Sequence, residues 1–369
     1  MLRLLQTSDV HLGARDTELG EAAATVRERR AAAFERALAL AISEKVDVVL
    51  IVGDLFDTNA VTRSIVSRVT AGLAGLAAAG IRTVVLPGDH DRLEPASVYH
   101  AFDFGELAGA PGSVVVLDPS AGPAGDLALP ELGLTITARF PAPDLPDDRW
   151  RVGLVHRLVR PRDDEIAGAG VDYLAVGGPH DEASGSAADV AWGASGAPDP
   201  VDIRRDRAGE VLLVRFDERG DRRSVSVERR RVGATRYEAI SLDPGTFADD
   251  AALAAAIAAR ADGPSSTDSA GADLILDVRL AGTWPDGIEA EPEALEAALR
   301  SRFLNLRVRT EASPVLSGAG APPPETVAGA FVRDLEARIA NPVEGDPPPD
   351  ELREALRLGR RLLMGTGGR

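Results

Sequence analysis

The stretch VDVVLIVGDLFD, residues 46–57, carries the pattern that decides the fold. A short β-rich run ends at a glycine turn, and the turn presents two aspartates, Asp54 and Asp57. Similar runs, LRLLQTS at 2–8 and RTVVLPG at 82–88, stand before and after it, and alanine-rich stretches predicted to be helical separate the three. Strands that alternate with helices in this way predict a parallel sheet with helices on its faces.

Beyond this region the strand-like runs continue with fewer helices between them. They lie near 113–118, 133–138, 152–156, 172–176, 210–216 and 222–232. A second, more antiparallel sheet packed on the first would accommodate them. From RYEAISL onward, two predicted helices and two strands indicate a small α/β domain. We therefore expect an α/β (α+β) chain with four parts: a two-sheet domain at 1–236, a small α/β domain at 237–311, a linker at 312–324, and C-terminal helices at 325–369.

Composition limits the chemistry that the chain can use. The sequence contains no cysteine, which excludes disulfides and thiolate ligands, so any metal must bind histidine and carboxylate side chains. No apolar run approaches the ~20 residues that span a bilayer, and the apolar run at the N-terminus, which ends before Asp9, is too short for a signal-peptide core. These features predict a cytoplasmic protein without membrane association. The net charge of -17 argues against non-specific coating of nucleic acid, although residues 204–231 hold ten arginines against six acids.

Five motifs share one kind of position, the turn just after a predicted strand. They are SDVH with Asp9 and His11, GDLFD with Asp54 and Asp57, GDHD with Asp89, His90 and Asp91, LVH with His156, and GGPH with His180. Ligands of α/β sheets gather at the carboxyl ends of the strands, so we expect these side chains to converge. The remaining histidine, His100, is interpreted as a helix-surface residue.

Histidine and carboxylate ligands suit manganese, iron, zinc or a similar divalent ion. A pair of such ions can activate water and neutralise charge that develops on a phosphoryl group, so phosphoester hydrolysis is the predicted reaction. Any one motif alone is also typical of a turn residue or a helix cap. Five together, in this order, favour the metal site.

These motifs resemble those of the calcineurin-like metallophosphoesterases. QTSDVHLG, VGDLFD, the small α/β domain and the terminal stretches ETVAGAFVRDLEARI and LREALRLGRRLL look like the Mre11/SbcD branch of DNA-repair nucleases. The resemblance implies a metallophosphoesterase sandwich flanked by helices, then a capping domain and a helix pair. It also implies a manganese-dependent DNA nuclease, active as a homodimer, whose partner is an SbcC/Rad50-type coiled-coil ATPase docked through 325–369.

The resemblance also implies a role for each site residue. Asp9, His11 and His180 would hold one manganese ion, and Asp54 would bridge to a second ion held by Asp89, His156 and position 178. His90 would lie over the scissile phosphate as a proton donor or transition-state stabiliser, oriented by Asp91. Asp57 would fix the geometry of a neighbouring ligand.

Two departures from the family pattern affect the second metal. Asp89 stands where the family usually has asparagine, and Gly178 stands where it has histidine. The coordination number falls by one unless water, Asp181 or Glu182 fills the gap, so we expect the second ion to bind weakly. A Gly178→His exchange should tighten it, unless the glycine is needed for a positive backbone φ.

Alternative interpretations stay open at this level. The chain could be a scaffold subunit of low or no activity that holds the ATPase or a DNA end, or a phosphodiesterase of small molecules. The C-terminal helices could fold back on the body instead of docking a partner, because an apolar stripe only predicts that one face is buried.

Overall fold

The computed structural model describes most of the chain, and the chain divides into two compact units. The described residues are 1–142, 144–146, 149–201, 208–219, 222–262, 273–282, 288, 291–310, 326–342, 347–348, 351–353, 355–356 and 359. The first unit consists of Met1–Glu238 with Ser265–Ile275, and the second of Ala239–Pro264 with Leu276–Arg369. The expected linker at 312–324 lies outside the described residues, as do parts of the arginine-rich segment.

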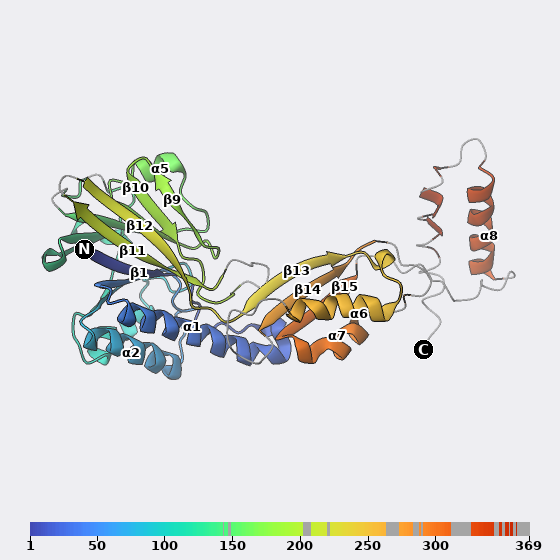
Figure 1. Cartoon of the computed structure of the whole chain (residues 1–369), viewed down its shortest axis with the longest axis horizontal. Coiled ribbons are helices and arrows are strands. Elements are labelled where there is room, and N and C mark those ends of the chain that lie inside the picture. Colours follow the sequence, from blue (N-terminus) through green and yellow to red (C-terminus); the bar gives the residue numbers. More distant parts are fainter. Residues whose placement is uncertain are drawn as a thin grey trace. The chain divides into compact units, whose positions relative to one another are not determined.

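The first unit contains a six-stranded sheet of order β12-β11-β1-β2-β3-β4 (Figure 1). Its strands are β1 (Leu2–Thr7), β2 (Val48–Val52), β3 (Arg82–Leu86), β4 (Val114–Val116), β11 (Glu210–Arg219) and β12 (Arg222–Arg231). Strands β1 to β4 are parallel, whereas β11 is antiparallel to β1 and β12 is antiparallel to β11. Every residue of β2 is buried, as expected for a strand covered on both faces.

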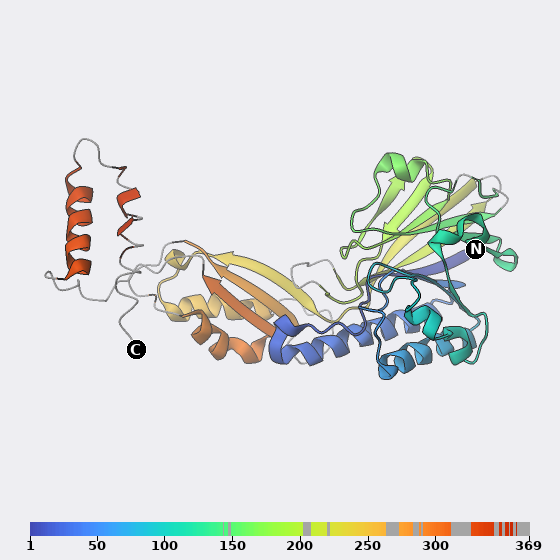
Figure 2. The same ribbon diagram turned by 180° about the vertical axis from the view of Figure 1, so that it is seen from behind.

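Helices cover one face of this sheet. The helices of the first unit are α1 (Ala23–Ser43), α2 (Arg63–Ala78), α3 (Val98–Ala101), α4 (Phe104–Leu107) and α5 (Asp163–Ala167). Short 3-10 helices span Thr17–Ala22, Pro119–Gly125 and Pro130–Leu132. Phe34 and Leu38 of α1 and Leu73 of α2 pack in one apolar cluster with Ile51 of β2. Figure 2 shows α1 and α2 from the opposite side.

The second sheet has the order β5-β6-β7-β8-β10-β9. Its strands are β5 (Leu127–Leu129), β6 (Leu134–Thr137), β7 (Trp150–His156), β8 (Tyr173–Gly177), β9 (Ala183–Ala187) and β10 (Val190–Ala194). Strands β6, β7, β8 and β10 are parallel, and the two edge strands are antiparallel to their neighbours. The second sheet is therefore more parallel than the sequence suggested, because the runs near 113–118, 210–216 and 222–232, expected in it, instead form β4, β11 and β12 of the first sheet. The β9–β10 hairpin at its edge was not foreseen.

The two sheets pack face to face around a common apolar core. Leu4, Leu50 and Val84 of the first sheet lie in one buried cluster with Ile136 and Leu154 of the second. The expected two-sheet sandwich flanked by helices is confirmed.

A buried polar side chain links the two sheets at the end where β1 finishes. The Gln6 amide Nε2 donates to the carbonyls of Val176 (3.2 Å) and Gly193 (2.9 Å), and its oxygen accepts from the Tyr173 hydroxyl at 2.5 Å. Because all these polar groups are buried, leaving any of them without its hydrogen-bond partner would lower the stability of the fold. Gln6 therefore fixes how β1 faces β8 and β10.

The second unit is built on a three-stranded sheet of order β13-β14-β15. Its elements are β13 (Arg236–Leu242), α6 (Asp250–Ala258), β14 (Leu274–Leu280), α7 (Pro292–Leu299), β15 (Asn305–Thr310) and α8 (Val327–Ala340), with 3-10 helices at Pro244–Thr246, Ala259–Asp262 and Arg300–Arg302. Val332 and Leu335 of α8 are buried, and so is Leu352 in the helical stretch that follows. The Phe331 ring approaches so closely that a Cβ on Gly359 would lie 2.0 Å from it, so α8 packs on this stretch.

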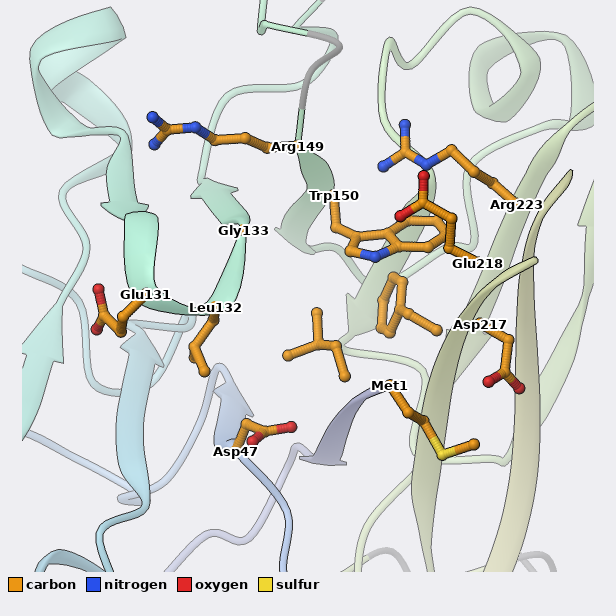
Figure 3. A pocket seen from close by; sticks show the side chains of 12 residues that line it. Met1, Asp47, Glu131, Leu132, Gly133, Arg149, Trp150, Asp217, Glu218 and Arg223 are labelled. Carbon is orange, nitrogen blue, oxygen red and sulfur yellow. The ribbon is translucent and has the colours of Figure 1, made fainter. Parts of the chain in front are cut away.

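Two cavities lie at the beginnings of the strands, away from the turns that carry the five motifs. The larger, of about 870 Å³, is lined by Leu2, Asp47, Gly133 and Trp150, each at or just before the start of a strand (Figure 3). The smaller, of about 610 Å³, shares Asp47 with it. Among the described helices, none combines the length and apolar character needed to cross a membrane.

Candidate metal centre

Three groups of side chains in the described part of the chain could each hold a metal ion. Within each group the ligand atoms all lie within 4.8 Å of one another. The groups are Asp9, His11 and His180; His11, Asp57 and His90; and Asp9, Asp54 and His156. Because Asp9 and His11 each belong to two groups, the three form one connected centre. Seven side chains that the sequence placed after five different strands therefore converge.

The sheet topology explains the convergence. Asp9 and Asp54 follow the parallel strands β1 and β2, and His156 and His180 end or follow the parallel strands β7 and β8. The His156 Nδ1–H donates to the Val52 carbonyl at 3.0 Å, which joins the carboxyl edge of one sheet to that of the other. Parallel strands end at a common edge, so packing the two sheets brings both sets of turns together.

Second hydrogen bonds orient two of the imidazoles. His11 Nδ1 lies 3.2 Å from Asp57 Oδ1, and His156 Nδ1 bonds the Val52 carbonyl. Each Nδ1 therefore carries the proton that it donates, which leaves Nε2 as the metal-binding nitrogen of the neutral ring. Asp57 thus contacts a ring whose geometry it is predicted to fix, and that role stays a prediction.

Asp54 lies between these two imidazoles. Its Oδ1 accepts from the backbone N–H of His90 at 2.8 Å, while Oδ2 lies 3.5 Å from His11 Nε2 and 3.2 Å from His156 Nε2. Both Nε2 atoms are buried and neither has a hydrogen-bond partner of acceptable geometry. Each nitrogen could bind one metal ion, and the carboxylate oxygen between them could then contact both ions. This arrangement is compatible with a bridging carboxylate.

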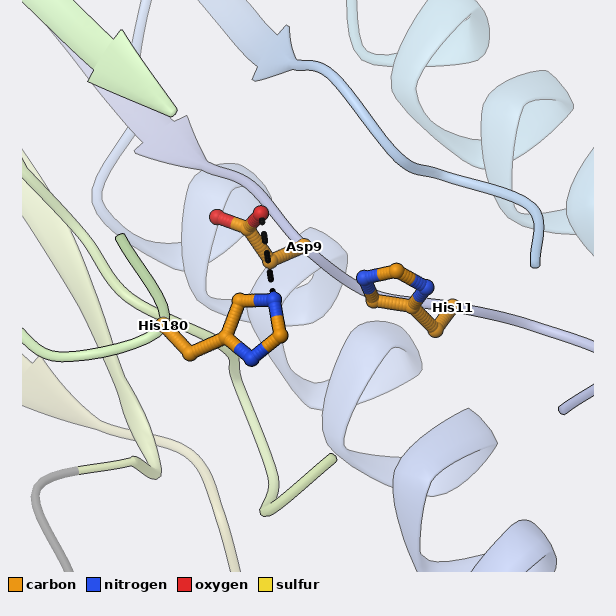
Figure 4. Close-up of side chains that lie close together, drawn as sticks. All are labelled: Asp9, His11 and His180. Carbon is orange, nitrogen blue, oxygen red and sulfur yellow. Dashed lines mark ion pairs between the residues drawn. The ribbon is translucent and has the colours of Figure 1, made fainter. Parts of the chain in front are cut away.

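Asp9 is held by the turns around it. Its carboxylate accepts from the Ser8 hydroxyl at 2.5 Å and from the backbone N–H of Gly178, which lies 3.1 Å from both oxygens. His180 Nε2 lies 3.9 Å from Asp9 Oδ1, with His11 beside the pair (Figure 4). Neither Ser8 nor the Gly178 N–H could be identified from the sequence, since both act through contacts that depend on the folded turns.

The GDHD turn is arranged differently from the expectation. Asp91 is fully buried and accepts from the N–H groups of Gly88 (2.7 Å) and Phe56 (3.1 Å) and from the Tyr99 hydroxyl (2.6 Å). His90 is instead oriented by the Asp57 carbonyl, which accepts from its Nδ1 at 3.0 Å. Asp91 thus braces the turn rather than the His90 ring, and Tyr99 is a supporting residue that the sequence did not reveal.

The two departures at the second metal differ in their surroundings. Asp89 is 46% exposed, and its Oδ1 pairs with Arg92 at 2.9 Å, so it belongs to none of the three groups. Gly178 has φ +101°, and a Cβ there would lie 2.1 Å from the Arg157 carbonyl oxygen. Glu182, suggested above as a replacement ligand, is turned onto Arg229 at 2.9 Å.

The donor set fits a divalent cation. It consists of carboxylate oxygens and imidazole nitrogens, the ligands preferred by manganese, iron and zinc. Asp9, His11, Asp54, His156 and His180 have side chains close enough to hold an ion without rearrangement, whereas Asp89 must first leave Arg92.

Burial and mutual charge shift the pKa values of three groups. Burial raises the pKa of Asp9 to about 6, against the opposing effect of His156. Burial would also raise the pKa of Asp54, but its contact with His156 and the His90 N–H lower it to about 2. Burial would lower the pKa of His156, yet Asp54 and Asp9 raise it to about 9. Without a bound cation, His156 would therefore carry a proton at neutral pH.

Comparisons with known proteins give the class of this domain. Residues 2–183 match the calcineurin-like phosphoesterase family, and this part of the chain is a calcineurin-like metallophosphoesterase domain. Membership of this family implies that the domain binds a divalent metal. A DNA double-strand break repair protein Mre11 of Saccharolobus solfataricus is 34% identical over 91 residues. That match covers 25% of this chain and 23% of the relative, so the chain spans only about a quarter of that protein's length.

Solved structures that match part of the chain include TT1561 of Thermus thermophilus and a dimetal phosphatase from Danio rerio. The first is 13% identical with a TM-score of 0.39, covering 63% of this chain and 99% of that chain. The second is 12% identical with a TM-score of 0.38, covering 63% and 98%. At these levels neither says anything about substrate.

A substitution at Gly178 tests whether the turn is locked. We expect Gly178→Ala to lower the free energy of unfolding of the metal-free protein by about 2–4 kcal/mol, because the new Cβ meets the Arg157 carbonyl at a positive φ. Gly80→Ala is the matched control: φ is +75° but nothing lies within 4 Å of its Cβ, so about 1 kcal/mol is expected. Equal losses in denaturant titrations would contradict the close contact. For the same reason Gly178→His should strain the turn before it tightens a metal.

Metal binding should release a proton from His156. The free protein holds this proton up to a pKa of about 9 and the metal complex does not, so affinity should rise about tenfold per pH unit between pH 7 and 9 and then level off. Below about pH 6, protonation of Asp9 should make the affinity for the metal fall more steeply as the pH decreases. Calorimetry of Mn²⁺ binding in buffers of different ionisation enthalpy measures the release. His156→Asn should abolish it and His100→Asn should not; no release by the wild type at pH 8 would refute the assignment.

Proposed function

We propose that this chain is a metal-dependent phosphodiesterase that cleaves DNA, as the nuclease subunit of an SbcCD- or Mre11–Rad50-like repair complex. The observation that carries the proposal is the position of Asp54 Oδ2 between two buried, orphaned histidine nitrogens, within a centre completed by Asp9 and His180. The partial match to Mre11 supports DNA as the substrate class.

In this proposal each site residue has one task. Asp9, His11 and His180 would hold one manganese ion, and Asp54 and His156, with Asp89 or water, would hold a second. The bound ions would supply an activated water and neutralise charge on the phosphoryl group. Asp57 keeps the His11 ring oriented through the 3.2 Å contact to Nδ1.

His90 is the residue best placed to meet the substrate. Its side chain is 51% exposed, and its ring centroid lies 4.6 Å from that of His11. Because Nδ1 is occupied by the Asp57 carbonyl, Nε2 is the atom that would face a phosphate and give a proton to the leaving oxygen. The backbone N–H of His90 meanwhile fixes Asp54, so the turn couples the proton donor to the metal ligand.

A scaffold without cutting activity is the second candidate. The observations that favour it are the locked turn at Gly178 and the pairing of Asp89 with Arg92, since both weaken the second metal position. A weak second site predicts low activity that depends steeply on Mn²⁺ concentration, whereas a scaffold predicts none at saturation.

Asp54→Ala is the direct test of the centre. We expect wild-type protein to bind one Mn²⁺ tightly and a second weakly, and to cleave linear duplex DNA. The variant should lose both ions, and cleavage should fall by about a thousandfold or more, the scale seen when a central catalytic group is deleted. Asp189→Ala, an exposed aspartate in the β9–β10 turn, is the control and should change neither. Wild-type protein that binds DNA but never cleaves it would favour the scaffold.

Partner docking is proposed for residues 325–369, together with a homodimer. Truncation after Pro324 should leave a metal-binding body that no longer co-purifies with a coiled-coil ATPase. A point variant separates docking from folding: Val327 is 79% exposed on α8, so Val327→Asp should weaken the complex while the helix pair stays folded. Arg333→Ser, also exposed on α8, is the control. Unchanged co-purification of the truncated chain would exclude docking through this segment.

A further inference from the structure

The loop that follows β7 carries two exposed apolar side chains beside the metal centre. Leu158 and Val159 are each 76% exposed and stand directly after Arg157, which follows the metal-facing His156. Two residues of chain reach at most about 7 Å, so Leu158 lies close to the centre. Among the described residues, this is the one place where two exposed large apolar side chains are consecutive. Exposed apolar groups beside a reactive site suggest a ligand that covers them.

The loop is held in place on both sides of this pair. The Arg157 N–H donates to the Gly177 carbonyl at 2.9 Å, and its guanidinium lies 4.8 Å from the Phe140 ring centroid. On the other side, the Arg160 guanidinium lies 4.5 Å from the Trp192 ring centroid, and the next residue, Pro161, is buried. Leu158 and Val159 therefore project from an anchored loop.

Three arginines flank the pair, and each is held by a neighbouring carboxylate. Arg157, Arg160 and Arg162 pair with the neighbouring acids Glu165, Asp163 and Asp164 at 3.4, 3.2 and 3.1 Å, and Arg162 also lies 3.8 Å from Glu165. Exposed pairs of this kind contribute little, so a phosphate can replace the carboxylate at an arginine. An apolar tip flanked by arginines matches a base face flanked by phosphates, provided that the phosphates take the place of the carboxylates.

We propose that Leu158 and Val159 form a wedge that packs against the terminal base pair of a DNA end and unstacks it, while Arg160 and Arg162 bind the adjacent phosphates. This inference rests on the proposed DNA-cleaving function. Apolar side chains inserted at base steps separate stacked bases at a modest energetic cost, and a terminal pair is stacked on one side alone. The wedge would thus deliver a single strand to the metal centre that begins two residues away.

The test compares wild-type protein, the double variant Leu158→Ser/Val159→Ser, and the control Leu107→Ser, an apolar residue 50% exposed at the end of α4. Mn²⁺ binding and hydrolysis of bis(p-nitrophenyl) phosphate should be unchanged in all three, because a small ester does not reach the wedge. On blunt duplex ends we expect the double variant to cleave at least tenfold more slowly, and on splayed ends to come within twofold of wild type. Fluorescence of 2-aminopurine at the terminal pair, with Ca²⁺ replacing Mn²⁺, should rise with wild type and the control but not with the double variant.

Equal cleavage of blunt ends by the double variant, or equal losses on blunt and splayed ends, would overturn the wedge. So would a change in oligomeric state of the double variant, which would make the loop a contact between copies of this chain. Failure of the proposed function is distinguishable: wild-type protein would then hydrolyse neither DNA nor the small ester at saturating Mn²⁺. The fluorescence arm still decides the wedge in that case, because end unstacking needs no cleavage.

Discussion

The pairing of the turn after β1 with the turn after β2 is the constraint on which the centre depends. The N–H groups of Asp9, His11 and Leu12 donate to the carbonyls of Gly53, Asp54 and Leu55 at 2.9–3.0 Å. Asp9, His11 and Asp54 all have left-handed backbones, with φ of 53°, 48° and 52°. Such conformations cost about 1–2 kcal/mol each for residues with a side chain. The backbone ladder holds these three residues in place, and their side chains belong to one connected centre.

Close approach of the two sheets is the second constraint, and glycines make it possible. A Cβ on Gly53 would lie 1.9 Å from His156 Nδ1, and one on Gly177 would lie 1.8 Å from the Val52 carbonyl oxygen. A Cβ on Gly88 would meet the Asp54 carboxylate at 2.2 Å. These three glycines lie in the motifs found in the sequence. Packing requires glycine there, because the space that a side chain would need is filled by the His156 ring, the Val52 carbonyl and the Asp54 carboxylate. The Gln6 amide completes the link through bonds to β8 and β10.

The sequence was a good guide to features that depend on local pattern. Alanine-rich stretches located α1 and α2, and short β-rich runs located the central strands. Polar residues after these strands identified the side chains that converge. The contacts of individual residues could be seen only in the folded structure. The partners of Asp91 are Tyr99 and two backbone N–H groups, which no spacing rule connects. The β9–β10 hairpin was missed because its small polar residues lack an apolar alternation, and the backbone at Gly178 has no signature apart from glycine itself. The specific catalytic roles stay predictions.

The two departures from the family pattern, Gly178 and Asp89, differ in what holds them: the first is fixed by its backbone and the second by a side-chain ion pair. Gly178 is fixed by its backbone: a side chain there meets the Arg157 carbonyl, and its N–H already bonds both oxygens of Asp9. Regaining a nitrogen ligand would require the turn to be rebuilt, and that would disturb Asp9 as well. Asp89 is fixed only by an exposed ion pair with Arg92, which contributes little and is screened by salt. A cation near Asp54 and His156 attracts the Asp89 carboxylate more strongly than a solvated guanidinium does, since two positive charges meet it there instead of one. If the proposed second ion binds there, its affinity would depend on a side-chain rotation at Asp89, and Arg92 would be the group that competes with the metal.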